Sequence, residues 1–467
     1  MNDGKPKEAC GVVAVYAPGQ EVAKTIYYAL YALQHRGEES AGIAVSEGDT
    51  MVVFKDMGLV GQVFDEYRLK SLTGGLGIGH VRYSTTGSSS WENAQPIHRD
   101  SGTLEVALGH NGNLVNTMDL LSKLAPRRRA ASTDSDLIAE MIVNSGKPTV
   151  EEGILDTLPR LKGAFTLVMM DHERVYGCRD PHGLRPLVIG SLSSGGYVMA
   201  SETCALDAIG AVLVREVEPG ELVTIDAQGI HSHRFAAATP ALCVFEYVYF
   251  ARADSVLYGK SVHKTRYQMG RRLWEESPAV ADLVMPVPDS GRGAAAGYAA
   301  ASGIPYGDAL FRSPYVGRTF IQPTQAIRQQ GIRTKLNPMA QMIEGKTLVV
   351  VDDSIVRGNS MRQIVRMLRD AGAKGVHVRV SSPPVQWPCF YGIDIASRDE
   401  LIAANTSVDE IRQHIEADSL GYLSLEGMLA STELASDKFC TACFSSEYPI
   451  AIPDDVKVTK NMLEAQI

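Results

Sequence analysis

One segment, KTLVVVDDSIVRGNSMRQIVRMLRDAG at 346–372, constrains the fold more than any other part of the sequence. An apolar run ends in Asp352 and Asp353, and a loop that contains Gly358 leads into an amphipathic helix. A buried strand followed by a loop and a helix is the repeating unit of a parallel sheet. Ligands bind at the carboxyl ends of such strands, where loop amides and a helix N-terminus form an anion site. We therefore expect an α/β domain that binds phosphate at 352–360.

Two neighbouring segments extend this unit. ADLVMPVPDSGRGAAAGYAAASG at 281–303 predicts a second strand, a turn and a helix of small residues, and GVHVRVSSPP at 375–384 predicts a third strand. We expect Ser290, in the turn, to reach a phosphate or its metal. The paired carboxylates of Asp352 and Asp353 suit ribose hydroxyls and Mg²⁺, a hard cation that prefers oxygen ligands. A solvated strand-to-helix turn is the alternative.

A long basic segment lies between these strands, FRSPYVGRTFIQPTQAIRQQGIRTKLN at 311–337. It has no acidic residue, and its cations are Arg312, Arg318, Arg328, Arg333 and Lys335. Long segments without a clear pattern inside a compact domain are often functional. We expect 312–337 to be a lid that places cations over a pyrophosphate leaving group and excludes water. A solvated basic loop is the alternative.

The first half of the chain has a different pattern, in which short strands outnumber helices. EVAKTIYYALYALQHRG at 21–37 predicts a helix because its apolar residues follow a 3.6-residue period and Gly37 ends it. The predicted strands are at 10–17, 41–45, 102–112, 163–171, 174–180, 186–191, 196–201 and 221–229. This pattern favours a layered α+β domain. We place the boundary at about residue 240, within HRFAAATPALC.

Composition narrows the class of protein. The chain has 467 residues, of which 45% are hydrophobic and 21% charged, so it is long enough for two or three globular domains. A net charge of -9 argues against sequence-independent binding to nucleic acid or to an anionic membrane. The sequence has no apolar run long enough to cross a bilayer and no signal peptide, so we expect the reducing cytoplasm. Seven widely spaced cysteines fit a catalytic thiol or a metal site better than a disulfide framework.

Cys10 stands directly before the first predicted strand, after a short polar tail. A single cysteine in that position is usually a small buried hydrophobe. If residues 1–9 are removed as a propeptide, Cys10 becomes the N-terminal residue and carries both a nucleophile and a base. An α-amino group titrates at about 7.7–8.0, so a useful fraction accepts the thiol proton at neutral pH. We interpret Cys10 as an N-terminal nucleophile.

The remaining parts of an amide-hydrolysing site follow along the chain. Arg82 offers a fork for a substrate carboxylate, and Asp134 offers a counter-charge for a substrate ammonium. Asn111 and the backbone N–H of Gly112 form a plausible oxyanion pair. Arg36 and Gly37 are expected near the same site. Free glutamine, an amino acid with an amide side chain, would use all of these groups.

These motifs resemble two known families. CGVV, LQHRGEESAG, GHVRYSTTG, GHNGNL and TDSD are similar to the class II, N-terminal-nucleophile glutamine amidotransferases. VVVDDSIVRGNS resembles the 5-phosphoribosyl-1-pyrophosphate (PRPP) signature of the type I phosphoribosyltransferases. FEYVYFARADS, YVGRTFIQP and RTKLN resemble enzymes that join both domains, and the likeness runs from about residue 10 to 445.

The resemblance implies a fold and an activity. It implies an αββα glutaminase domain at 10–240, with Cys10, Asn111 and Gly112 as catalytic residues and Arg36, Arg82 and Asp134 as glutamine ligands. It implies a phosphoribosyltransferase domain at 241–467. The expected reaction converts glutamine, water and PRPP into 5-phosphoribosylamine, glutamate and pyrophosphate, the first committed step of purine nucleotide synthesis. A homotetramer inhibited by purine nucleotides is implied, as is passage of ammonia between the sites inside the protein.

The PRPP site is expected to combine the signature loop, the metal ligands and the lid. Mg²⁺ would be held near Ser290, Asp352 and Asp353. The PRPP ligands expected are Asp352, Asp353, Ser354, Ile355, Val356, Arg357, Gly358, Asn359, Ser360, Arg333 and Lys335.

The remaining cysteines divide into two groups. Cys440 and Cys443 form a C-x₂-C pair, for which zinc, a [4Fe–4S] cluster and chance all remain open on spacing alone. One branch of the resembling family carries a short propeptide and a four-cysteine cluster. Its ligands match Cys243, Cys389, Cys440 and Cys443, which implies a structural [4Fe–4S] cluster in the C-terminal segment. Cys178 and Cys204 have no partner motif, and we expect both to be buried thiols.

Two other functions remain as alternatives. The first is a class II amidotransferase with another acceptor, against which DDSIVRGNS argues. The second is a non-enzymatic metal-binding regulator that senses PRPP or nucleotides through a degenerate site. The presence of Cys10, Arg82, Asn111 and Asp134 together argues against that regulator.

Overall fold

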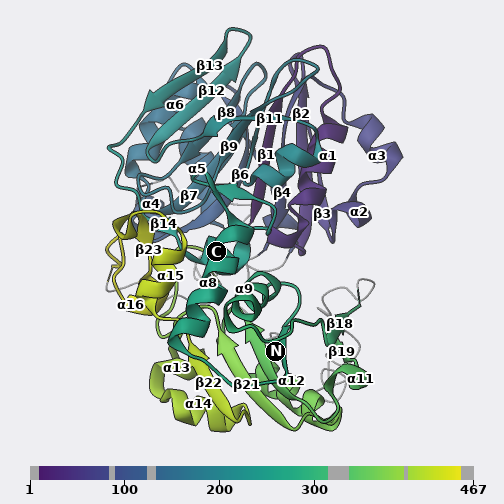
Figure 1. Cartoon of the computed structure of the whole chain (residues 1–467). Coiled ribbons are helices and arrows are strands. Elements are labelled where there is room, and N and C mark those ends of the chain that lie inside the picture. Colours follow the sequence, from purple (N-terminus) through teal and green to yellow (C-terminus); the bar gives the residue numbers. More distant parts are fainter. Residues whose placement is uncertain (1–9, 84–89, 124–132, 314–335, 394–397, 454–467) are drawn as a thin grey trace.

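The computed structural model describes residues 10–83, 90–123, 133–313, 336–393 and 398–453. The propeptide predicted at 1–9 lies outside the described residues, as does 314–335 of the predicted lid. The chain forms two parts, one built from its first half and one from its second half, with the C-terminal segment beside their junction (Figure 1). No helix within the described residues is long and apolar enough to span a membrane.

The first part is built on two antiparallel sheets. The seven-stranded sheet has the order β11 (Val212–Glu216), β9 (Val188–Ser191), β10 (Tyr197–Ala200), β1 (Gly11–Tyr16), β4 (Leu76–Arg82), β2 (Ser40–Glu47) and β3 (Thr50–Met57). The six-stranded sheet has the order β13 (Gly229–Arg234), β12 (Glu221–Asp226), β8 (Val175–Arg179), β7 (Gly163–Met170), β6 (Glu105–Leu114) and β5 (Ile97–Asp100).

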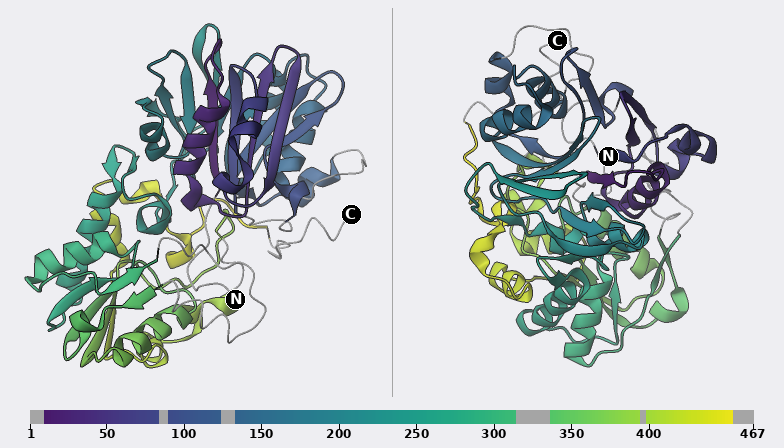
Figure 2. Two further views of the ribbon diagram at one scale, coloured as in Figure 1. Left: turned by 90° about the vertical axis from the view of Figure 1, so that its right-hand side faces the viewer. Right: turned by 90° about the horizontal axis from the view of Figure 1, so that it is seen from above.

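Helices cover the outer face of each sheet, which gives the predicted αββα order (Figure 2). The first sheet is covered by α1 (Ala23–Ala32), α2 (Val60–Val63), α3 (Glu66–Ser71) and α7 (Thr203–Ala208). The second is covered by α4 (Thr117–Ser122), α5 (Asp134–Val143) and α6 (Val150–Thr157). On β1, Val12 and Ala14 pack between the sheets whereas Val13 and Val15 face the helices. The strand is apolar throughout because both of its faces are buried.

The second part is an α/β domain around a parallel sheet, as predicted. Its strand order is β17 (Leu283–Pro286), β20 (Thr347–Asp352), β21 (Gly375–Val380) and β22 (Ser419–Tyr422). One face carries α8 (Val262–Glu276) and α9 (Arg292–Ser302), and the other carries α12 (Asn359–Asp370) and α14 (Val408–His414). Helices α8 and α9 approach so closely that a Cβ on Gly297 would lie 1.9 Å from the carbonyl oxygen of Tyr267. The small residues of α9 therefore allow this contact.

Short elements complete the described fold. The strands are β14 (Leu242–Cys243), β15 (Val256–Leu257), β16 (Lys260–Ser261), β18 (Leu310–Arg312), β19 (Leu336–Pro338) and β23 (Phe439–Cys440). The helices are α11 (Ala340–Ile343), α13 (Ile402–Asn405), α15 (Leu425–Ser431) and α16 (Ala442–Ser445). The 3-10 turns are η1 (Gln34–Arg36), η2 (Trp91–Asn93), η3 (Leu158–Arg160), η5 (Arg398–Glu400) and η6 (Ser436–Lys438), and η4 (Glu246–Phe250) is a π-helical turn.

Two of these elements bring distant segments together. Strand β14 pairs in parallel with β23, so the region where the two parts meet lies against the C-terminal segment. Cys243 also contacts the first part of the chain, because its N–H donates to the carbonyl oxygen of Leu184 at 3.2 Å. Strands β18 and β19 pair antiparallel and hold the two ends of the predicted lid side by side.

Candidate active sites and the contacts that join them

Cys10 directly precedes β1 and lies at the centre of the seven-stranded sheet. Its thiol donates to the carbonyl oxygen of Tyr83 at 3.5 Å, and only 7% of the residue is exposed. Burial raises the pKa of the Cys10 thiol, although the hydrogen bond to Tyr83 and the charge of Arg82 oppose this effect. The thiol is therefore protonated at neutral pH and needs a base before it can act as a nucleophile.

Arg82 and Asp134 lie near the thiol, as predicted. Arg82 ends β4, the strand next to β1, and both its charge and that of Asp134 act on Cys10. Asp134 begins α5, where its carboxylate accepts from the backbone N–H of Leu114 at 3.1 Å and of Ser135 at 2.8 Å. Burial alone would raise the pKa of Asp134, but His110 and these N–H groups hold it below its usual range. A guanidinium and a carboxylate thus flank the thiol.

Asn111 and Gly112 occupy neighbouring positions on β6. Asn111 is fully buried, and among the described residues neither Oδ1 nor Nδ2 has a hydrogen-bond partner. A buried polar group without a hydrogen-bond partner costs about 1–3 kcal/mol. Such groups are found at catalytic positions, where a bound ligand supplies the missing partner. Gly112 has φ +152°, and a Cβ there would lie 2.1 Å from the carbonyl oxygen of Ala164, so only glycine fits.

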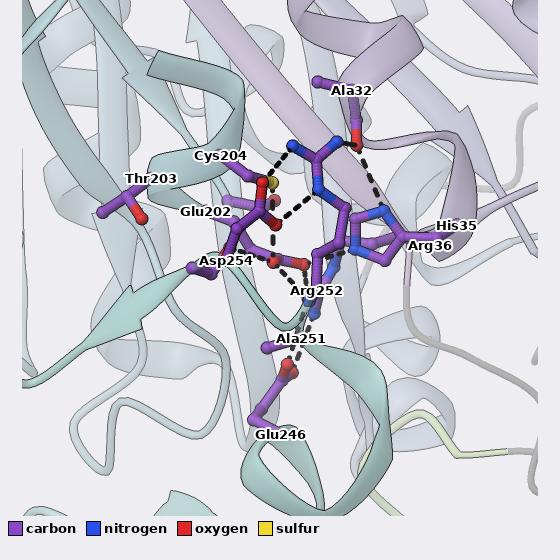
Figure 3. Close-up of polar contacts among 12 residues, drawn as sticks. Ala32, His35, Arg36, Glu202, Thr203, Cys204, Glu246, Ala251, Arg252 and Asp254 are labelled. Atoms are coloured by element: carbon purple, nitrogen blue, oxygen red, sulfur yellow. Dashed lines mark hydrogen bonds and ion pairs between the residues drawn. The ribbon is translucent and has the colours of Figure 1, made fainter. Parts of the chain in front are cut away.

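Arg36 is fully buried and its contacts differ from the predicted role (Figure 3). Its Nε donates to the carbonyl oxygen of Cys10 at 3.2 Å. Its terminal nitrogens bind Glu246 at 3.0 and 2.8 Å and Glu202 at 2.5 Å. The guanidinium therefore holds the backbone of Cys10 and has no exposed surface to offer a substrate carboxylate. Gly37 is the next residue and lies against the backbone of Arg82. A Cβ on Gly37 would stand 2.7 Å from the carbonyl carbon of Arg82.

Glu202 is the second centre of this buried ionic network (Figure 3). It accepts from His35 Nε2 at 2.7 Å, from the hydroxyl of Ser255 at 2.6 Å and from the backbone N–H of Arg252 at 2.8 Å. Arg252 in turn donates to the carbonyl oxygen of Ala32 at 3.1 Å. Burial alone would raise the pKa of Glu202, but His35 and Arg36 hold it far below its usual range. No sequence motif predicts a role for Glu202, Glu246 or Arg252, although Glu246 and Arg252 lie in FEYVYFARADS.

In the second part, the predicted phosphate loop follows β20. Asp353 accepts from the hydroxyl of Ser354 at 2.6 Å and also from the hydroxyl of Ser290, which brings two of the predicted segments together. Its backbone N–H donates to Asp352 Oδ1 at 2.9 Å. Gly358 has φ +76° and precedes the first turn of α12, whose N-terminal N–H groups face an anion favourably.

The other predicted PRPP ligands divide into backbone and charged groups. The side chains of Ile355 and Val356 are buried in the domain core, so only their backbone can face a ligand. Arg357 forms an ion pair with Glu400. Arg312 of the predicted lid pairs with Asp289 at 2.5 Å, beside Ser290. Arg333 and Lys335 lie outside the described residues.

The four cysteines singled out by resemblance gather at one place. Every pair among their thiols interacts electrostatically, and Cys243 lies opposite Cys440 in the ladder of β14 and β23. None of them forms a disulfide. Within the described ranges, no three histidine, cysteine or acidic side chains are close enough to hold a single ion. The residues grouped here are Cys243, Cys389, Cys440 and Cys443. Four thiols gathered at one place are a donor set that structural zinc and a [4Fe–4S] cluster both use.

Cys178 and Cys204 are fully buried, which confirms the prediction for both. The Cys178 side chain packs in the core under the six-stranded sheet, and Cys204 packs under the seven-stranded sheet.

Comparison with protein-family models finds both expected domains. A glutamine amidotransferase domain matches residues 80–208, and a phosphoribosyl transferase domain matches residues 274–382. An amidophosphoribosyltransferase from Mycobacterium tuberculosis is 55% identical over 473 residues, which cover 98% of this chain and 90% of that protein. The amidophosphoribosyltransferase of Bacillus subtilis is 46% identical over 456 residues, which cover 96% of this chain and 95% of that protein.

Solved structures agree with these matches. The glutamine PRPP amidotransferase from B. subtilis, in complex with ADP and GMP, superposes with a TM-score of 0.89 and 45% identity. The match covers 96% of this chain and 98% of that one. A structure described as the allosteric regulatory enzyme of purine biosynthesis has a TM-score of 0.90 and 46% identity.

Proposed function

The chain belongs to the amidophosphoribosyltransferase family, the enzymes of purine biosynthesis, and from that premise we propose which residues carry each half of its reaction. The observation that carries the proposal is that the charges of Arg82 and Asp134 act on the Cys10 thiol, while the buried amide of Asn111 has no partner among the described residues. The same chain also contains the predicted phosphate loop at 352–360, directly before helix α12. The phosphoribosyl transferase match makes a class II amidotransferase with another acceptor the weaker alternative.

Glutamine is hydrolysed at Cys10. The α-amino group that removal of residues 1–9 exposes takes the thiol proton, and the sulfur attacks the side-chain carbonyl carbon of glutamine. Asn111 Nδ2 and the backbone N–H of Gly112 stabilise the oxyanion. The protonated amine returns its proton to the leaving nitrogen, so ammonia departs and a thioester remains. Water then cleaves the thioester to glutamate and restores the thiol.

Two charged side chains select an amino acid as the substrate. Arg82 binds the α-carboxylate of glutamine, and Asp134 binds its α-ammonium. The low pKa of Asp134 supports this role because the carboxylate is ionised throughout the neutral range. Arg36 has a different part, for which its hydrogen bond to the Cys10 carbonyl is the support: it positions the nucleophile.

PRPP binds in the second part. The loop 352–360 and the first turn of α12 receive its 5-phosphate, and the ribose hydroxyls lie near Asp352 and Asp353. Arg333 and Lys335 supply positive charge over the pyrophosphate. Ammonia attacks C1 of the ribose as the C1–O bond to pyrophosphate breaks, which gives 5-phosphoribosylamine. The two halves remain coupled when ammonia travels inside the protein and is not protonated by solvent.

Two inorganic groups complete the proposal. Mg²⁺ would be held near Ser290, Asp352 and Asp353, where hydroxyl and carboxylate oxygens gather, and would neutralise charge on the pyrophosphate. A [4Fe–4S] cluster would be held by Cys243, Cys389, Cys440 and Cys443, tying the C-terminal segment to the rest of the chain. The mutual proximity of four thiols supports this assignment.

Regulation by nucleotides has support from a relative. We propose that purine nucleotides inhibit the protein, because the B. subtilis relative was solved with ADP and GMP. The proposal also includes the cytoplasmic location and the homotetramer that the family resemblance implies. A PRPP-sensing regulator without catalysis is the alternative, and the complete set of glutaminase groups disfavours it.

The experiment that tests the proposal uses purified mature protein. Its mass should lack residues 1–9, and chemical analysis should find iron and sulfide for one four-iron cluster per chain. With glutamine, PRPP and Mg²⁺, pyrophosphate should form only when both substrates are present. Glutamate release without PRPP-dependent pyrophosphate would favour another acceptor, and neither product would favour the regulator. Stoichiometric zinc would overturn the cluster assignment.

A further inference from the structure

Arg185 occupies a buried position next to the four cysteines. Only 1% of it is exposed, yet it lies on no helix or strand. Its guanidinium donates to Glu246 Oε1 at 3.2 Å and to the carbonyl oxygen of Tyr391 at 3.1 Å. Its third donor, Nε–H, is buried and has no partner among the described residues. Its charge interacts with the thiols of Cys243 and Cys389.

Glu246 connects this arginine to the glutaminase nucleophile. One carboxylate binds Arg185 on one side and Arg36 on the other, and all three side chains are buried. Arg36 in turn holds the carbonyl oxygen of Cys10. A continuous run of buried ionic contacts therefore leads from Arg185 to the backbone of Cys10. Tyr391, which accepts from Arg185, donates its backbone N–H to Cys389 Sγ at 3.4 Å and so connects this run to the cysteines.

A second contact runs from Cys389 to the oxyanion strand. The carbonyl oxygen of Phe390 accepts from Asn113 Nδ2 at 2.9 Å. Gly392, with φ +96°, lies against Gly112 so closely that a Cβ on it would stand 3.1 Å from the Gly112 carbonyl carbon. The loop that carries Cys389 thus rests on the backbone expected to hold the oxyanion, and Arg185 anchors that loop through Tyr391.

We propose that Arg185 is a positioning residue that links the four-cysteine site to glutamine hydrolysis. It offsets the negative charge of the thiolates and, through Glu246, Arg36 and the Tyr391 carbonyl, fixes the backbones of Cys10 and Gly112. The inference rests on the proposed function, since it takes the cluster and the role of Cys10 from there.

Charge and geometry can be separated by substitution. Glutamine at 185 removes the charge, whereas lysine keeps it but cannot contact Glu246 and the Tyr391 carbonyl together as a planar fork does. Arg379→Lys is the matched control. Arg379 is also buried and donates to the carbonyl oxygens of Ser277 and Pro278 at 2.7 and 3.1 Å, within the other domain.

The test measures iron and sulfide content, the midpoint potential of the cluster, and kinetics with glutamine and with ammonia. Arg185→Gln should shift the potential to more negative values, because the added electron loses a nearby positive charge. Arg185→Lys should leave the potential close to that of the unaltered protein. Both variants should lower kcat/KM for glutamine by about tenfold or more. Losses of this size are typical when a residue that holds a metal ligand or active-site group in position is replaced. In both variants the ammonia-dependent reaction with PRPP should keep its rate. The control Arg379→Lys should match the unaltered protein in all of these measurements.

The failures are distinguishable. Unaltered protein without iron and sulfide would refute the proposed cofactor and this inference with it. Unaltered protein with a cluster, combined with an unchanged potential in Arg185→Gln, would overturn the role of the charge. If Arg185→Gln does not fold, Arg185→Lys decides alone: an unchanged kcat/KM for glutamine would overturn the link to Cys10.

Discussion

Arg36 and Glu246 form a two-point ion pair across 210 positions of sequence, with N–O distances of 3.0 and 2.8 Å. Neither side chain has any exposed surface. Arg36 also holds the Cys10 carbonyl, and Glu246 belongs to the short π-helical turn that opens the second part of the chain. The pair therefore joins Cys10, the proposed nucleophile, to the domain that matches the phosphoribosyl transferase family.

Removal of both partners together should cost less than the sum of the two separate removals. Glu246→Leu leaves Arg36 with Glu202 alone, and Arg36→Met leaves Glu246 with Arg185 alone, so each should lower the free energy of unfolding by about 3–5 kcal/mol. The double variant Arg36→Met/Glu246→Leu should lose less than the sum of the two single variants. Denaturant titration of all three proteins measures this. Glu66→Gln, which removes an exposed partner of Lys70, is the control and should change little. Strict additivity would show that the pair is not coupled.

Asn111→Ala should impair only glutamine chemistry. The residue is buried and unpaired within the described structure, and loss of one oxyanion donor typically lowers kcat about 10²–10³-fold. Steady-state rates with glutamine and with ammonia separate the two half-reactions. Asn144→Ala, at an exposed helix end, is the control. An equal loss with both nitrogen sources would contradict an oxyanion role.

Gly358→Ala should raise KM for PRPP with either nitrogen source. Gly358 has φ +76°, and a Cβ there would lie 3.0 Å from Ile402 Cδ1 and 3.1 Å from His414 Cδ2, so the substitution strains the backbone of the predicted phosphate loop and crowds these two side chains. Gly303→Ala is the matched control because Gly303 has φ +73° and a Cβ there meets nothing within 4 Å. Both variants should lose about 1–2 kcal/mol of stability from backbone strain. An unchanged KM for PRPP in Gly358→Ala would contradict phosphate binding by this loop.

Acid should weaken the network around Glu202. Its pKa is lower in the folded protein than in the unfolded chain, so its contribution is present above about pH 4.3 and is lost as pH falls toward the folded value. Glu202→Gln removes this contribution at every pH. The stability difference between the two proteins should therefore be constant near neutrality and shrink by about 1.4 kcal/mol per pH unit below about 4.3. Chemical unfolding at several pH values measures it, and a difference independent of pH would contradict the prediction.

Local pattern predicted the parts of the fold that carry strong signals. TLVVV became β20, the helix after it became α12, and the apolar run after Cys10 became β1. Strand β4 was missed because Gly77 and Gly79 weaken a strand pattern. Gly79 is required there by packing, since a Cβ would lie 2.4 Å from Ile26 Cγ2. Helix α5 was missed because its first turn, DSD, is polar although every one of these residues is buried.

The sequence predicted those site residues that belong to recognisable motifs. Cys10, Arg82 and Asp134 gather as expected. The contacts of Arg36 were not predictable because its partners, Glu202 and Glu246, lie far away in sequence and no spacing rule relates them to it. The same holds for Arg185, whose importance appears only when folding places it between the cysteines and Glu246.

The most direct test compares mature unaltered protein with Cys10→Ala while glutamate and pyrophosphate are followed together. The unaltered protein should release the two products in equal amounts from glutamine, PRPP and Mg²⁺. Cys10→Ala should release neither from glutamine, yet should still form pyrophosphate when ammonia replaces glutamine, because the second site keeps its residues. Glutamine-dependent glutamate release by Cys10→Ala, or loss of the ammonia-dependent reaction in a folded sample, would contradict the account.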